Sequence, residues 1–285
     1  DESMLGYPRY QRALEWAATV DPHKAVDRVM TWAARHLPEG LSRSRLGRKL
    51  NYVAMQADRR ASRRYAPNIM YFMENEKFDA YGEALRPMLR RSSLDLLEPY
   101  FAGIASAAAA AAWADLHTYL PDDLLVKVDV ASMAFGLEAR SPLLDHHLME
   151  WAAAIPAEQK MRGGVSKSLF KAAVARLLPH EVIHRPKMGF GVPVDRWLTG
   201  PMAGLARDLL TSERFRSRGL IRPDWIAWAM ARNHDGRAVL WHRLWALLML
   251  ELWYREWIDP AEIRPAVPAT QVTAEVMMTV GADHC

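Results

Sequence analysis

The chain has 285 residues, a formal net charge of +4 and one cysteine. This length is enough for one large domain or two small ones, and a single cysteine excludes a disulfide framework and suits a reducing compartment such as the cytoplasm. The small positive charge would suit acidic ligands, but a nucleic-acid-binding protein usually concentrates its basic residues in one patch. The most arginine-rich segment, residues 43–64, has its arginines at helical spacing, which we interpret as a solvated face or a surface facing another domain.

Helical periodicity runs through the first part of the chain. Residues 9–35 place apolar side chains at helical spacing, with a break and a new helix start at Asp21–Pro22. Residues 41–64 predict a second helical region, and the alanine-rich run up to Leu116 predicts a third because alanine has the highest helix propensity. The longest apolar stretch, residues 102–114, is mostly alanine and too weakly hydrophobic to insert into a membrane, so no membrane partner is expected.

The middle of the chain predicts short helices with proline-marked ends. Residues 124–130 alternate only weakly between apolar and polar and are the strand candidate. A short helix is predicted for residues 142–151, and it ends before Pro156 because the residue preceding a proline avoids the helical region. A further helix is predicted through residues 167–177, with a turn beginning at Pro179. The fold class expected from these patterns is mainly α.

Tryptophans become frequent in the last third of the chain, in pairs three or four residues apart that share one helix face; they are Trp225, Trp228, Trp241, Trp245, Trp253 and Trp257. One interpretation is an aromatic ligand box or a partner surface, and the other is a helix-packing core. We favour the core, because aromatic residues at helical spacing usually pack together, and we interpret His242 as structural. Residues 259–285 contain prolines without periodicity and are expected to form a flexible tail.

The segment 119–145 mixes charged and apolar residues closely. Four polar residues follow one another among valines, a methionine and a phenylalanine: Asp129, Ser132, Glu138 and Arg140. A segment that only packed against a core would place its charges on one solvated face, whereas this order predicts that some of them point inward or into a cleft. Because charges held there are costly unless they are paired or bind a ligand, the segment has the pattern of an enzyme site.

Four sequence blocks resemble one known family. Residues 120–145 read LPDDLLVKVDVASMAFGLEARSPLLD, and they are followed by GGVSKSLFKAA at 163–173 and LPHEVIHRPKMGFGVPVDRWL at 178–198. Residues 1–10, DESMLGYPRY, are similar to the end of a GDGGDE-x-x-x-GYPRY loop. These blocks, in this order, resemble the synthetase domain of glutamine-dependent asparagine synthetases over residues 1–200, which is far more specific than any single motif.

The resemblance implies a fold, namely the helical C-terminal portion of an α/β adenine-nucleotide (ATP-pyrophosphatase) domain. The expected divisions are a synthetase-like part at residues 1–200, a tryptophan-rich helical extension at 201–258 and the tail at 259–285. The family's pyrophosphate-binding SGGxDS loop has no counterpart in this sequence, and the one cysteine, Cys285, cannot serve as the N-terminal nucleophile of the family's glutaminase domain. We therefore expect a fragment of a longer enzyme that is inactive by itself.

The resemblance also implies roles at the phosphate end of the site. Asp1 matches a carboxylate expected to bind Mg2+, which prefers oxygen ligands, and Glu2 is a weaker candidate for contacting substrate or ATP. Lys167 matches the lysine that reaches the phosphates and the adenylate, and it follows Gly163–Gly164 at a predicted helix start, where backbone N–H groups also favour anions. Without the resemblance, a terminal acid indicates a frayed chain end, and a lysine in the first turn of a helix indicates a solvated side chain.

Five further residues are candidates for the site. Glu138 and Arg140 form an E-x-R element that either pairs internally or binds the charged ends of the substrate. Asp129 and Ser132 would order this segment or contact substrate, and a purely structural network is a nearly equal alternative. Lys187 lies in a loop hinged by glycines and would close over the site; the alternative is a structural turn.

Three classes of function follow from these features. The first is an ATP-dependent amidotransferase that makes asparagine from aspartate and glutamine-derived ammonia through a β-aspartyl-adenylate, using ATP and Mg2+. The second uses the same adenylating scaffold on another acceptor, closing β-lactam or macrolactam rings or amidating sugars or peptides. The third is a non-catalytic helical module that docks on a partner, which Lys167 and the charges of residues 119–145 argue against. A homodimer is left open.

Overall fold

The computed structural model describes residues 1–19, 60–185, 191–234 and 240–259. Within these ranges the regular structure is helical, and extended pairing is limited to two isolated bridges, Tyr81–Ile221 and Arg162–Val165. The prediction of a mainly α fold is therefore confirmed. The assignment to an adenine-nucleotide domain stays a prediction.

The described helices are short and numerous. Up to residue 133 they are α1 (Pro8–Thr19), α5 (Ala61–Tyr65), η1 (Ala66–Asn68), α6 (Glu74–Ala80), η2 (Arg86–Arg90), η3 (Ser93–Leu96), α7 (Glu98–Phe101), α8 (Ala107–His117), the π-helical turn η4 (Leu120–Leu125) and α9 (Val126–Met133). They continue as η5 (Pro142–Leu144), α10 (His146–Ala154), α11 (Ala157–Lys160), α12 (Ser168–Val174), α13 (His180–Ile183), α14 (Val194–Thr199), α15 (Ala203–Leu210), α16 (Glu213–Ser217), α17 (Pro223–His234), α18 (Trp241–Trp253) and the π-helical turn η6 (Tyr254–Ile258).

Polar side chains set the starts of several helices. Ser106 precedes the alanine run of α8 and accepts a hydrogen bond from the backbone of Ala109, and Ser212 does the same for α16. Asp145 caps α10 by accepting from the backbone N–H of Leu148 at 3.2 Å. Each cap satisfies a backbone donor that the first helical turn leaves unpaired, so these boundaries follow directly from the sequence.

One core holds the N-terminal helix in place. α1 packs against α8, and their shared core contains buried alanines of α8 together with Tyr10 and Tyr65. Asp115 lies fully buried among them and accepts hydrogen bonds from the hydroxyls of Tyr10 (2.5 Å) and Tyr65 (2.6 Å). Arg9 forms an ion pair with the same carboxylate at 2.7 Å. Burial raises the pKa of Asp115, although Arg9 and both hydroxyls oppose the shift.

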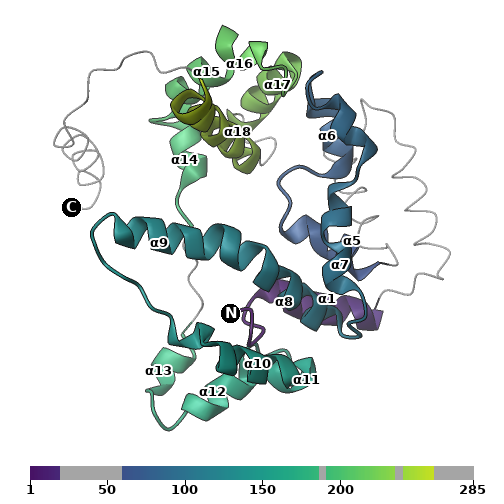
Figure 1. Cartoon of the computed structure of the whole chain (residues 1–285), viewed down its shortest axis with the longest axis vertical. Helices are drawn as coiled ribbons and strands as arrows, with labels where there is room; N and C mark the ends of the chain where they lie inside the picture. Colours follow the sequence, from purple (N-terminus) through teal and green to yellow (C-terminus); the bar gives the residue numbers. More distant parts are fainter. Residues whose placement is uncertain (20–59, 186–190, 235–239, 260–285) are drawn as a thin grey trace.

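A second core lies among α14–α18, at the top of Figure 1. Trp225 is 2% exposed in this core, and Trp228, Trp241 and Trp245 pack against it. The packing interpretation is thus confirmed for these tryptophans, whereas Trp253 and Trp257 have exposed side chains. His242 stacks on Trp241 and on Tyr71, as a structural residue would.

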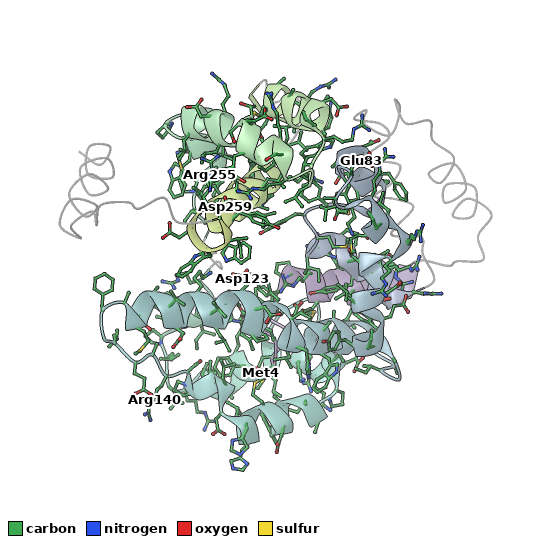
Figure 2. All side chains as sticks on the ribbon, turned by 45° about the horizontal axis from the view of Figure 1, so that its top comes forward. Met4, Glu83, Asp123, Arg140, Arg255 and Asp259 are labelled. Carbon is green, nitrogen blue, oxygen red and sulfur yellow. The ribbon has the colours of Figure 1, made fainter. Side chains whose placement is uncertain are left out.

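The second core also reaches back along the chain. It includes Ala80 of α6 and Val194 and Leu198 of α14, and Arg243 of α18 pairs with Glu76 of α6 at 2.7 Å. Glu76, Ala80, Val194 and Leu198 precede the predicted boundary at residue 200, which stays a prediction. At the other end, Asp259 is fixed by Arg214 (2.7 Å) and Arg218 (2.6 Å) and lies where the chain leaves η6 (Figure 2); the remainder of the predicted tail is outside the described residues.

Several predicted elements need correction. The strand candidate at residues 124–130 is wrong, because this segment completes η4 and forms most of α9, with two aspartates in the first turn of η4 that favour a helix start. The helix expected at 142–151 is divided, since Asp145 caps a new helix after the 3-10 turn η5. The next helix, α12, is shorter than expected at both ends, and Pro179 caps α13 where a turn was expected.

The expectation that some of Asp129, Ser132, Glu138 and Arg140 point inward is also wrong. α8, η4 and α9 follow one another as a long rod in Figure 1, and α9 contains no fully buried residue. Asp129, Glu138 and Arg140 are exposed and Ser132 is half-buried. Because the apolar side chains around them are exposed as well, the order of residues does not separate a buried face from a solvated one. The helical regions predicted at 20–35 and 41–59 lie outside the described residues.

Candidate active site

A cavity of about 330 Å3 lies between the N-terminal loop, the junction of η4 with α9, and the start of α12. Apolar side chains such as Leu124, Val128 and Phe170 form much of its wall. The charged and polar residues that line it are Asp1, Glu2, Ser3, Tyr7, Lys127, Ser141 and Lys167. A concave, mostly apolar cavity with a few convergent polar groups is the usual form of a small-molecule site.

Lys167 occupies a strained backbone position at the edge of this cavity. It is the N-cap of α12 with φ of 56°, in the left-handed region that residues with a side chain seldom adopt. Gly163 and Gly164, also at positive φ, bring the chain into this turn without strain. The turn directs the Lys167 ammonium to the Oδ1 carboxylate oxygen of Asp1 as an ion pair. Strain of this kind is typical of residues whose orientation matters for function.

Gly6 makes this approach possible. A Cβ atom at this position would collide with both Oδ1 of Asp1 and Cε of Lys167. The backbone N–H of Gly6 also donates to the carbonyl of Asp1 at 2.7 Å, which closes the N-terminal loop. The glycine of the GYPRY motif is therefore required by the contact between Asp1 and Lys167.

Burial shifts the pKa of two titratable side chains that line the cavity, Lys167 and Tyr7. It lowers the pKa of the Lys167 ammonium, and the nearby carboxylate of Glu2 partly opposes this shift. Glu2 is 4% exposed, and within the described structure its Oε1 oxygen has no hydrogen-bond partner. The hydroxyl of Tyr7 is hydrogen-bonded to Glu2, and burial together with that carboxylate raises the pKa of Tyr7. Arg9 lies 4.1 Å from the ring centre of Tyr7, so the buried network around Asp115 supports this wall.

The structure brings together three of the eight predicted site residues. Asp1, Glu2 and Lys167 line one cavity although the lysine is 165 or more positions away in sequence from both acids. Glu138 and Arg140 do not line it; they form an exposed pair at 2.9 Å, and Arg140 lies at the edge of the molecule in Figure 2.

The other three predicted residues do not join this cavity in the described structure. Asp129 is exposed on α9, and Ser132 donates a hydrogen bond to the Asp129 carbonyl at 3.2 Å. Neither residue lines the cavity. Lys187 lies outside the described residues.

Four charged or polar lining residues were not predicted from the sequence, namely Ser3, Tyr7, Lys127 and Ser141. All four lie within blocks that carry the family resemblance, but nothing in their spacing distinguishes them from their neighbours. The sequence gives one indication for Tyr7, because this residue directly follows Gly6, the glycine that the N-terminal loop requires.

The two acids of the cavity, Asp1 and Glu2, are compatible with a magnesium ion that also binds substrate and water, but not with a metal site whose ligands all come from the protein. Within the described ranges no group of three or more histidines, cysteines or acids gathers in a metal-binding arrangement. Magnesium usually binds through one or two carboxylates together with substrate phosphates and water. Asp1 and Glu2 supply such a pair, and the unbonded, buried Oε1 of Glu2 is a free oxygen donor.

The fold and this cavity define a mainly helical protein with a paired-charge small-molecule site. Comparison with known families then identifies it further: the asparagine synthase family matches residues 1–255. The chain belongs to the asparagine synthase family. No solved structure gives a significant match to it, and no described helix combines the length and hydrophobicity needed to cross a membrane.

Individual relatives agree with this assignment. The glutamine-hydrolyzing asparagine synthetase 1 of Bacillus subtilis is 26% identical over 257 residues, covering 89% of this chain and 39% of that protein. A putative glutamine-hydrolyzing asparagine synthetase of Mycobacterium tuberculosis is 28% identical over 268 residues, covering 91% and 38%. A shorter match, 29% over 119 residues, is to amidase chry2 of Gibberella zeae. The chain thus spans about two fifths of the length of the two synthetases.

Proposed function

We propose that this chain forms part of the synthetase site of an ATP-dependent enzyme that makes asparagine from aspartate and glutamine-derived ammonia. The observation that carries the proposal is the meeting of Lys167 with Asp1 and Glu2 in one cavity, in a chain of the asparagine synthase family. We infer that glutamine hydrolysis and pyrophosphate binding by an SGGxDS-type loop belong to other parts of a longer protein, since this chain spans 39% of the length of the Bacillus subtilis relative. The expected compartment is the cytoplasm.

The proposed chemistry begins with attack of the aspartate β-carboxylate on the α-phosphorus of ATP. A bond forms between a carboxylate oxygen and that phosphorus, the bond to the bridging oxygen breaks, and pyrophosphate leaves. Negative charge accumulates on the departing phosphates, and a preorganised cation lowers the energy of that state most effectively in a site shielded from water. We assign this role to Lys167, and its partial burial and strained turn support the assignment. Ammonia then attacks the β-aspartyl-adenylate and releases AMP.

Asp1 and Glu2 have complementary roles in this proposal. They would hold Mg2+, which supplies positive charge beside the phosphates. In the described structure Asp1 neutralises Lys167, and Tyr7 holds Glu2 against the cavity wall through its hydrogen bond. We infer that phosphates entering the cavity compete with Asp1 for the lysine, which would leave the Asp1 carboxylate available to hold Mg2+.

The E-x-R element is proposed to recognise the charged ends of the substrate. Glu138 and Arg140 are exposed and, within the described residues, form an ion pair with each other, so both remain accessible to a ligand. Asp129 and Ser132 would order α9 or contact the substrate, and Lys187 is proposed to close over the site from its glycine-hinged loop.

The experiment that tests this function uses the full-length gene product. Pyrophosphate release is measured with ATP, Mg2+ and a panel of amino acids, and amide products are identified by mass spectrometry with glutamine or ammonium as nitrogen source. The proposal predicts release that depends on aspartate and asparagine as the product. Release with a different carboxylic acid would favour the same scaffold acting on another acceptor, and no release with any acid would favour a docking module.

A further inference from the structure

A second cavity of about 230 Å3 shares the wall of the first. Glu2 and Ser3 line both cavities. The rest of the second cavity is formed by Leu5, Ile104 and residues of α8, α10 and α11, and it is almost entirely apolar, with Trp113, Leu116 and Met149 as its larger side chains. This size is below the range of cavities that hold drug-sized ligands, so any occupant is small.

One cation lies in this apolar wall. Lys160, the last residue of α11, lines the second cavity and is 7% exposed. Within the described structure its ammonium has no hydrogen bond and no ion pair, and its main-chain carbonyl accepts from Ser168 at 2.9 Å. Burial lowers the pKa of Lys160. The side chain is thus largely buried and has no acid partner among the described residues, although a partner acid would be expected for a lysine at this depth.

We propose that the second cavity binds a small carboxylate with an apolar body, its carboxylate on Lys160 and its carbon chain against Trp113 and Met149. A carboxylate supplies the missing counter-charge and accepts charge-assisted hydrogen bonds, which are the stronger class. The apolar wall excludes a highly polar ligand, because its remaining polar groups would lose water without finding partners.

The position of Glu2 distinguishes two sources of this carboxylate. An α-amino acid would place its ammonium near the buried Glu2 carboxylate, which also faces the first cavity. A simple monocarboxylate would use Lys160 alone.

The test is calorimetric titration of the full-length protein with three ligands of the same carbon skeleton, namely butyrate, 2-aminobutyrate and butyramide. Binding of either acid but not of neutral butyramide is expected. Tighter binding of 2-aminobutyrate identifies an amino-acid site, and tighter binding of butyrate identifies a monocarboxylate site. Because binding is the readout, the result does not depend on the proposed synthesis of asparagine.

Variants locate the ligand. Lys160→Met should weaken the Kd at least about tenfold, which corresponds to about 1.4 kcal/mol, while Lys167→Met in the first cavity and Lys171→Met on α12 should leave it unchanged. Methionine fills the same space without charge, so the variant is expected to fold; Lys160→Gln serves as a second variant. Absence of binding at millimolar acid, equal binding by Lys160→Met, or loss of binding with Lys167→Met would each overturn the proposal.

Discussion

The buried carboxylate of Asp115 offers the sharpest test of how the site is supported. It accepts from two tyrosine hydroxyls and pairs with Arg9, which is 12% exposed. Asp115→Ala would leave a nearly buried guanidinium without its counter-charge, and breaking a buried pair in this way costs about 3–5 kcal/mol. The hydroxyls of Tyr10 and Tyr65 would lose their acceptor as well, so we expect the upper part of that range. Asp115→Asn retains one acceptor oxygen and should cost less.

The measurement is equilibrium unfolding in urea, followed by circular dichroism, with the free energy taken from the linear dependence on denaturant. Asp122→Ala is the matched control, because Asp122 is exposed in η4 and its substitution should change the free energy by no more than about 0.5 kcal/mol. If Asp115→Ala destabilised the protein no more than this control, the network would not hold the N-terminal helix, and the argument that it supports the wall of Tyr7 and Glu2 would fail.

Three further outcomes are expected. Trp225→Ala should lower the free energy of unfolding by about 3–5 kcal/mol because its side chain is in the core, whereas exposed Trp257→Ala should be nearly neutral; equal effects in urea unfolding would contradict the core assignment. Lys160→Met should raise the melting temperature at pH 7. Since the folded-state pKa of Lys160 lies below 10.5, wild-type stability is lost as the pH falls below that value, and the advantage of the variant should shrink as the pH rises towards it. Glu138→Gln removes an exposed pair worth less than about 1 kcal/mol, so the melting temperature should hold while KM for the acceptor rises; the reverse pattern would make the pair structural.

Local features of the sequence predicted the parts of the fold that depend on neighbouring residues. The alanine run of α8 predicted a helix because propensity acts over a few positions. The tryptophan pairs predicted a helix-packing core for the same reason; Trp225 lies in the core and three of the other five tryptophans pack against it. The weak alternation of apolar and polar residues at 124–130 led to the wrong prediction of a strand, because valines also fit a helix when the flanking residues favour one.

The site was predicted by family resemblance more than by residue pattern. Most charged residues of 119–145 are exposed on a helix and a loop. The sequence did not predict this, because it does not show which faces of α9 other elements cover. The contact of Lys167 with Asp1 joins the two ends of a long stretch of chain and depends on a left-handed turn and on the glycine at position 6. The burial of Lys160 could not be predicted from the sequence, because a lysine at the end of a one-turn helix that follows a proline is ordinarily solvated.

The central claim is that Lys167 stabilises the phosphates during adenylation, and the exchange of labelled pyrophosphate into ATP by the full-length protein measures this step directly. Lys171→Ala, on the same helix and outside the cavity, is the control. We predict that Lys167→Ala lowers the exchange rate at least about 100-fold with its circular dichroism spectrum unchanged, since removal of a preorganised charge from such a site costs about 3 kcal/mol. Exchange near the wild-type rate in a folded Lys167→Ala protein would contradict the account.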